Sequence, residues 1–424
     1  MLAVDPFSHM EEAWKLESNP FPAEAIRNLG TKSQPYSDEV FPQETQDFRR
    51  KFVRGMLLGS ASIGFLWSEG QRNDTGYGKT TLMQAVRNEV NSDMGATTLQ
   101  KAGMKAERVR PIAAALANLN TLQATGLYPV LFQATVDLTL APEGGQKAVF
   151  EAARERICSE IDNDDPAQIA LEVQEAWLGI APGGGPLRPD LVAAFAQGGA
   201  TATRIALSAV SDAMRLRAGI QFLDFSLAVL AAARVEALIL MIDQLEDLAT
   251  NKAIPSSKRS KEIGRIRDLL ELPPYADRLK LVFTFHNRAA QVLERFWESN
   301  RLPRFENIPE NASAVVALRG LPDDESAAKL LAVYLESARL EPIADELLPF
   351  EIEAVAALRQ AAESRPGILL ALAHKLIDHA ANQGLPVISG DTARKFLSGD
   401  IDLPERDLSD FDVDDQNVDD ILLG

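Results

Sequence analysis

A glycine-rich loop that carries a lysine and two threonines is the strongest chemical signal in the sequence. It reads NDTGYGKTT from Asn73 to Thr81, and it lies between a short apolar run and a helix-forming segment. Glycines allow backbone N–H groups to curl around a phosphate, and the start of the helix adds the positive end of its dipole. In such a loop Lys79 reaches the β- and γ-phosphates, and the Thr80 hydroxyl is a ligand for Mg²⁺. The pattern therefore predicts a site for ATP and Mg²⁺.

The loop departs from the full GxxxxGK[ST] pattern at its first position, where the chain has Asn73. Asparagine is among the residues that best tolerate a positive φ, so the loop can still close. The predicted nucleotide-binding residues of the loop are Asn73, Asp74, Thr75, Gly76, Tyr77, Gly78, Lys79, Thr80 and Thr81.

A second signal is an apolar strand that ends in an acid, Asp243. This is the pattern of a Walker B element, in which the carboxylate holds Mg²⁺ through water. The metal ligands are thus expected to be Thr80 and Asp243. The next position commonly holds a glutamate that polarises the attacking water, but here it is Gln244. We therefore expect slow hydrolysis, with Glu246 as the candidate base.

Polar residues after the fourth predicted strand complete the candidate site. The run FTFHN offers Asn287 as the sensor of the γ-phosphate, with Thr284 as the second choice. His286 could equally be a histidine of the core or of the sheet edge. Further along the chain, Arg304 or Arg301 could act across a subunit boundary as an arginine finger. That role would require a homo-oligomer.

Apolar runs that alternate with helical patterns predict the elements that position these residues. The expected strands are residues 63–67, 127–136, 237–242, 279–285 and 314–318, and a helix is expected over 81–90. Strands and helices in alternation indicate an α/β fold with a parallel, doubly wound sheet.

The chain is expected to have four parts. These are an N-terminal arm (1–50), an α/β domain (51–320) with a large helical insertion at about 163–222, a helical domain (321–398) and an acidic tail (399–424). From Asp400 the tail has ten acids and one base, a net −9, and apolar residues alternate with the acids. This composition predicts a disordered segment. It would either dock on a basic protein partner or simply aid solubility.

Composition excludes several classes of site and partner. The net charge of −18 over 424 residues means that nucleic acid could bind only through a local basic patch. The best candidate is Lys252–Arg267, with six bases and one acid, although a solvated loop would have the same composition. One cysteine and four histidines exclude a disulfide framework and disfavour a histidine metal site. The sequence predicts no signal peptide, membrane span or membrane partner, and hence a cytoplasmic protein.

Across roughly residues 19–397 the chain resembles the AAA+ and STAND groups of P-loop ATPases. NPFP (Asn19 to Pro22) looks like the element that lines the adenine pocket in origin-recognition-type ATPases, which implies this role for Asn19 and Phe21. IDQLEDL at 242–248 is similar to the Walker B of bacterial STAND ATPases. SRPGILLALAHKLIDHA at 364–380 looks like the segment of a helical lid that carries a sensor-2 arginine. Here that slot is Gly367, with Arg365 two residues earlier.

The resemblance implies that the helical domain closes over the nucleotide, and three functions then compete. The first is an ATP-driven switch or remodeller in a bacterial multi-protein system, such as defence against foreign DNA or control of mobile elements. The second is a DNA-bound ATPase of the initiator or transposition type. The third is a nucleotide-binding scaffold without catalysis, which Asn73 and Gln244 favour.

Overall fold

The computed structural model describes residues 5–23, 34–59, 62–68, 76–119, 126–142, 145–245, 247–250, 254–285, 287–302 and 314–399. Among them, two compact units can be distinguished. The larger is built from Gln46–Trp67 and Met83–Val316. The smaller holds the residues up to Thr45, those from Ser68 to Leu82, and those from Ala317 onward. Residues 400–424 of the predicted tail lie outside the described residues.

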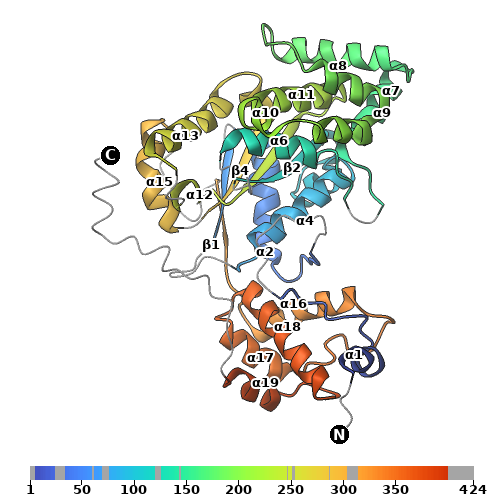
Figure 1. Cartoon of the computed structure of the whole chain (residues 1–424), viewed down its shortest axis with the longest axis vertical. Helices are drawn as coiled ribbons and strands as arrows, with labels where there is room; N and C mark the ends of the chain where they lie inside the picture. Colours follow the sequence, from blue (N-terminus) through green and yellow to red (C-terminus); the bar gives the residue numbers. More distant parts are fainter. Residues whose placement is uncertain are drawn as a thin grey trace. The chain divides into compact units, whose positions relative to one another are not determined.

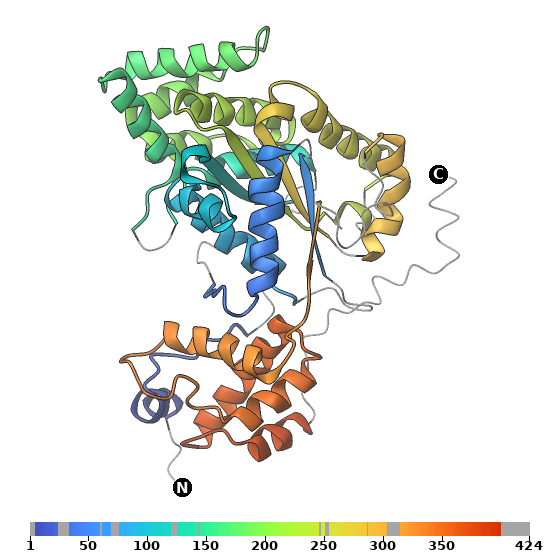
Figure 2. The same cartoon turned by 180° about the vertical axis from the view of Figure 1, so that it is seen from behind.

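A five-stranded sheet forms the centre of the fold, in the order β2-β3-β4-β1-β5. The strands are β1 (Ile63–Ser68), β2 (Ile112–Asn118), β3 (Ala237–Asp243), β4 (Leu279–Phe285) and β5 (Val315–Leu318). The pairs β1–β4, β3–β4 and β2–β3 are parallel. Helices cover both faces of the sheet (Figures 1 and 2), and β2 and β3 are accordingly buried along their whole length. The predicted parallel, doubly wound α/β fold is confirmed.

Eleven helical segments of very different lengths pack around this sheet among the described residues. They are α2 (Pro42–Phe48), the π-helix η1 (Arg49–Gly55), α3 (Met56–Leu58), α4 (Lys79–Ser92), α5 (Ala96–Lys101), the 3₁₀ turn η2 (Ala106–Arg108), α6 (Leu127–Asp137), α12 (Asp247–Thr250), α13 (Ser256–Glu271), α14 (Tyr275–Arg278) and α15 (Asn287–Ser299). Gly64 lets η1 and α3 lie directly on β1. A Cβ at this position would come within 2.6 Å of Met56 and 2.7 Å of Phe52.

One predicted strand is wrong. Residues 127–136 form the helix α6, and the strand missing from the prediction is β2, residues 112–118. Helix α6 is buried on nearly all sides, so its apolar residues show no helical period that would separate it from a buried strand. Pro129 stands in its first turn, where proline is tolerated. Strand β2 has the sequence IAAALAN, and alanine has a low preference for strands.

The outer edge of β2 is closed by side chains. Three of its backbone N–H groups donate to amide or carboxylate oxygens of α4 and α6. The pairs are Ala114 with Asn91 (2.9 Å), Leu116 with Asp137 (2.9 Å) and Asn118 with Gln133 (3.0 Å). Burial raises the pKa of Asp137, while the Arg87 guanidinium, 3.3 Å from it, opposes that shift. Because these donors are satisfied, β2 does not offer an open edge for pairing with another strand.

A run of helices longer than the predicted insertion at about 163–222 lies between α6 and β3 and shares its core with the sheet. It consists of α7 (Val149–Ile161), α8 (Pro166–Ile180), α9 (Pro189–Ser208), α10 (Asp212–Arg217) and α11 (Gly219–Ala232). Phe150, Phe195 and Phe225 come from α7, α9 and α11. Their rings meet edge to face with centroids 5.6–6.3 Å apart. They belong to the same apolar cluster as Leu240 of β3.

Helix α9 is broken at Gly198 and Gly199, and α7 caps both halves. Gly199 has φ +54° and ψ −135°, and a Cβ there would lie 2.4 Å from the Glu151 carboxylate. That carboxylate accepts from the Ala200 N–H (3.1 Å), the start of the second half. Arg154 donates to the Ala196 carbonyl (3.2 Å), at the end of the first half. The glycine pair is therefore required by a capped kink.

The smaller unit is helical, and its core includes the start of the chain. Its helices are α1 (Pro6–Trp14), α16 (Asp324–Ser337), α17 (Ile352–Ala361), α18 (Pro366–Asn382) and α19 (Gly390–Leu397). Trp14 is fully buried in one apolar cluster with residues of α16, α17 and α18, and its indole N–H donates to the Pro386 carbonyl (2.9 Å). The segment that the sequence presents as an arm thus includes a helix packed into this core.

Candidate functional site

The described part of the glycine-rich loop has the backbone that a phosphate-binding loop needs. Gly76 and Gly78 have φ of +86° and +83°, in the left-handed region that glycine enters at low cost. A Cβ at Gly78 would meet nothing within 4 Å, so the space beside it is open. Lys79 begins α4, and Thr80 and Thr81 are its next two residues. Asn73, Asp74 and Thr75 lie outside the described residues.

A buried serine holds the loop lysine. The Lys79 ammonium donates to the Ser68 hydroxyl (2.9 Å), and Ser68 is the fully buried last residue of β1. Ser68 is not among the residues predicted from the sequence. Its signal is a single polar residue that ends an apolar strand just before the loop. Tyr77, like Thr80 and Thr81, is half-buried.

The helix α18 contacts the loop through its first turn. The Gly367 N–H donates to the Gly76 carbonyl (2.7 Å). A Cβ on Gly367 would lie 2.9 Å from the Gly76 Cα, so a side chain there would collide with backbone. This contact gives a physical reason for glycine at the position where the resemblance implies a sensor-2 arginine. Arg365 is the N-cap residue of α18, and its guanidinium lies 3.4 Å from the Glu363 carboxylate.

The NPFP segment is anchored further along the same helix. The Asn19 side-chain amide donates to the His374 carbonyl (3.0 Å) and to the Asp378 carboxylate (2.8 Å). Phe21 is buried, and its ring lies 6.0 Å from each of the rings of Tyr334 and Phe350. Asn19 is thus bonded to a partly exposed stretch of α18, whereas Phe21 belongs to the apolar core of the smaller unit. Contact of either residue with adenine stays a prediction.

Asp243 is buried at the end of β3 and is bonded to β4 through one hydroxyl. The Thr284 hydroxyl donates to Asp243 Oδ1. The Gln244 N–H donates to the same oxygen (3.0 Å) and to Thr284 Oγ1 (2.9 Å). Gln244 has φ +64°, which is uncommon for a residue other than glycine. The structure therefore brings Asp243, Gln244 and Thr284 together.

The remaining predicted catalytic residues cannot be placed in the same way. Glu246, His286 and Arg304 lie outside the described residues. Asn287 begins α15, and only its backbone is described. Arg301 follows α15 with φ +59°.

The described part of the basic run, 254–267, includes most of α13, and its arginines contact groups of the larger unit. Lys252 lies outside the described residues. Arg265 donates to Glu262 (2.5 Å) and lies 3.7 Å above the Tyr128 ring. Glu262 in turn accepts from the Leu127 N–H (2.8 Å) at the start of α6. Arg267 pairs with Glu271 (2.9 Å), and Arg259 is buried. The exposed cations of this helix are Lys258 and Lys261.

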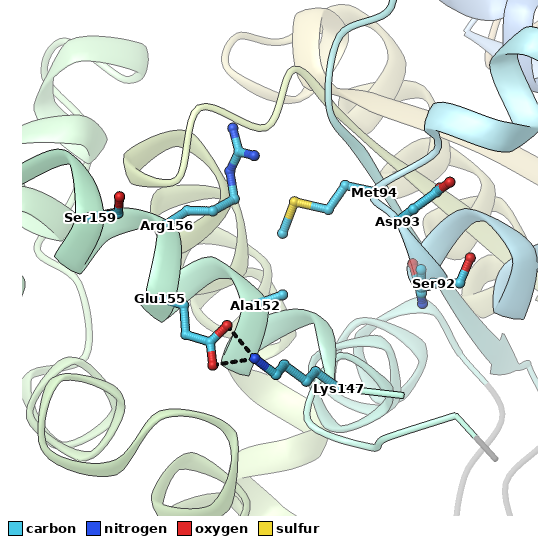
Figure 3. Close-up of a pocket in the computed structure, with 9 residues that line it drawn as sticks. Ser92, Asp93, Met94, Lys147, Ala152, Glu155, Arg156 and Ser159 are labelled. Atoms are coloured by element: carbon cyan, nitrogen blue, oxygen red, sulfur yellow. Dashed lines mark hydrogen bonds and ion pairs between the residues drawn. The ribbon is translucent and has the colours of Figure 1, made fainter. Parts of the chain in front are cut away.

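A separate cavity of 420 Å³ lies between the end of α4 and the side of α7 (Figure 3). Lys147 and Glu155 pair across part of its wall (2.6 Å), and Met94 and Arg156 face it from other sides. The Met94 carbonyl accepts from the first residue of β2, which places the cavity at the amino end of that strand. Asp243 is the last residue of β3, at the carboxyl ends of the strands, so this cavity is distinct from the surroundings of Asp243.

No group of three or more His, Cys, Asp or Glu side chains among the described residues is placed to hold a metal ion. Nor is any helix among the described residues long and apolar enough to cross a membrane.

Comparison with known proteins gave matches only among solved structures. No family of proteins and no curated protein matches the chain. The Aeropyrum pernix ORC2 protein in its ADPNP–ADP complexes matches with a TM-score of 0.45 and 12% identity over 84% of this chain and 66% of that one. Its ADP form matches with a TM-score of 0.42 and 13% identity, over 85% of this chain and 72% of the other. The present chain thus spans about two thirds of the ORC2 chain in the first comparison.

Proposed function

We propose that this chain binds ATP with Mg²⁺ and acts as a nucleotide-dependent switch of the AAA+/STAND type. The observation that carries the proposal is the left-handed backbone of Gly76 and Gly78, directly before Lys79 and Thr80 at the start of α4. Backbone N–H groups of a glycine loop, a helix N-terminus and an ammonium group are the combination that binds nucleotide phosphates.

The sheet supports the place of Mg²⁺ in this proposal. Strands β1 and β3 both pair with β4 in parallel, so the carboxyl ends of all three strands point to the same side of the molecule. In open parallel sheets, ligands bind beyond the carboxyl ends of the strands. The Thr80 hydroxyl and, through water, the Asp243 carboxylate would hold the ion. Hard oxygen ligands of this kind suit Mg²⁺, which neutralises charge on the β- and γ-phosphates when bound.

The switch follows from the bond between the loop and α18. Because the Gly367 N–H donates to the Gly76 carbonyl, a change of the loop backbone on nucleotide binding acts on α18 without an intermediary. The same helix holds Asn19 of the NPFP segment. The helical domain would thus sense the nucleotide. A role of this chain in a bacterial defence or mobile-element system stays a prediction from the resemblance.

Hydrolysis is expected to be slow, because Gln244 stands where a carboxylate would polarise water. Glu246→Gln should lower phosphate release to background in a coupled assay while ATP affinity stays within about twofold. Glu271→Gln, which removes a carboxylate on α13, is the control and should change neither quantity. Normal release by Glu246→Gln would show that another group is the base. If the wild type binds ATP but releases no phosphate, the non-catalytic scaffold is the better description.

The acidic tail offers a testable partner site. Ten acids against one base after residue 399 should attract a basic protein, and salt screens exposed charges over about 8–10 Å. A chain that ends at Gly399 should therefore lose a partner that the full chain retains in a low-salt pull-down. It should keep its melting temperature and ATP affinity. A fall of many degrees in melting temperature would instead make the tail part of the packed structure.

DNA binding at α13 is the weaker candidate. Arg265 and Arg267 are paired with carboxylates on their own helix, so phosphate contact would break those pairs. Stimulation of turnover by Arg301 or Arg304 from a second copy also stays a prediction.

A further inference from the structure

Thr284 is fully buried at the end of β4, yet its hydroxyl has two partners on β3 and the turn after it. The hydroxyl donates to Asp243 Oδ1 and accepts from the Gln244 N–H (2.9 Å). The Thr284 carbonyl accepts from the next backbone N–H, that of Leu245 (3.2 Å). One residue thus fixes the carboxylate, the amide that follows it and the exit of the turn.

This arrangement also explains the backbone of Gln244. Gln244 has φ +64°, and a residue other than glycine keeps such a backbone conformation only where neighbouring groups hold it in place. Here the N–H of Gln244 is bonded to Asp243 Oδ1 and Thr284 Oγ1 together. Asp247 N–H donates to the Gln244 carbonyl (3.0 Å), which closes the turn on its other side. The left-handed turn and the carboxylate orientation are therefore one unit.

We propose that Thr284 is a positioning residue that aims the Asp243 carboxylate, rather than a sensor of the γ-phosphate. This role rests on the proposed binding of Mg²⁺ and ATP. A carboxylate whose Oδ1 accepts from Thr284 and Gln244 has its plane fixed by those two donors. The direction of its other oxygen is then set as well. Loss of the hydroxyl would free this orientation and leave the Gln244 N–H with one acceptor fewer.

Thr284→Val is the test, because valine has nearly the shape of threonine but no hydroxyl. Thr284→Ser restores the hydroxyl and is the matched rescue. ATP affinity of the full chain is measured with Mg²⁺ and with EDTA. Mg²⁺ raises the ATP affinity of the wild type above its value in EDTA, and in Thr284→Val we expect this increase to be about tenfold smaller. A tenfold change is near the low end of what a hydrogen bond to a charged group contributes. Affinity in EDTA should change less than twofold, and Thr284→Ser should recover to within about threefold of wild type.

Amide hydrogen exchange gives a second readout that needs no nucleotide. The Gln244 amide should exchange about tenfold faster in Thr284→Val than in wild type or Thr284→Ser. Unchanged exchange, or an equal loss of affinity with Mg²⁺ and with EDTA, would overturn the positioning role. A wild-type chain that binds no ATP would overturn the proposed function. Wild-type binding with the same Mg²⁺ dependence in Thr284→Val would overturn the positioning role alone.

Discussion

Replacing Lys79 by alanine is expected to weaken ATP binding about ten- to hundredfold. The substitution removes the charge that is proposed to contact the phosphates, and hydrogen bonds to charged groups contribute about 1.5–3 kcal/mol. The ammonium is held by the Ser68 hydroxyl (2.9 Å), so it is directed rather than free to turn to solvent. Titration of a fluorescent ATP analogue against both proteins measures the difference.

The control for this experiment is Lys258→Ala. Lys258 is an exposed lysine on α13, and its removal changes the net charge by the same amount. It should leave the affinity within about twofold of wild type. Equal affinity in Lys79→Ala and wild type would remove the loop from the nucleotide site. Equal loss in both variants would point to net charge rather than to a specific contact.

Trp14→Ala is expected to destabilise the smaller unit by about 3–5 kcal/mol, the usual cost of removing a buried aromatic side chain. Trp14 is fully buried among residues of the helical core, and its indole N–H donates to the Pro386 carbonyl (2.9 Å). With two units, unfolding need not be a single transition. Hydrogen exchange of the α18 amides is therefore the appropriate measurement, and protection should fall strongly.

Phe7→Ala provides the matched control on the same helix. Phe7 is 70% exposed, so its loss should cost less than about 0.5 kcal/mol. If the α18 amides are equally protected from exchange in Trp14→Ala and in Phe7→Ala, the N-terminal segment is not part of this core.

Most of the fold could be predicted from the sequence, because four strands are short apolar runs bounded by polar residues. The predicted bounds agree with the structure for β4 and fall one residue short for β3, since both strands are short apolar runs of the kind that buried parallel strands have. The exchange of α6 for β2 shows where this reasoning fails. In a buried helix the pattern has no polar face, and in an alanine-rich strand composition favours a helix.

The motif residues of the site could also be predicted, because local spacing determines them. Gly76, Gly78 and Lys79 are identified by their distances along the chain. The partners of the motif could not be found in this way. Ser68 was missed, and the bond of Gly367 to Gly76 depends on how a distant helix packs. No pattern in the sequence records such a contact.

The same limit applies to Thr284. The sequence offered it as a second choice for a sensor, on its position at the end of a strand. Its bonds to Asp243 and Gln244 arise because β3 and β4 are neighbours in the sheet. Neither the strand order nor the left-handed turn at Gln244 is visible in the residues alone.

ATP with Mg²⁺ is proposed to bind at the loop before α4. Isothermal titration calorimetry of ATP into the full chain, once with Mg²⁺ and once with EDTA, measures this binding. We expect saturable binding at one site per chain, which weakens when EDTA removes the metal. An absence of binding heat under both conditions, together with no shift of the melting temperature at saturating ATP, would contradict it.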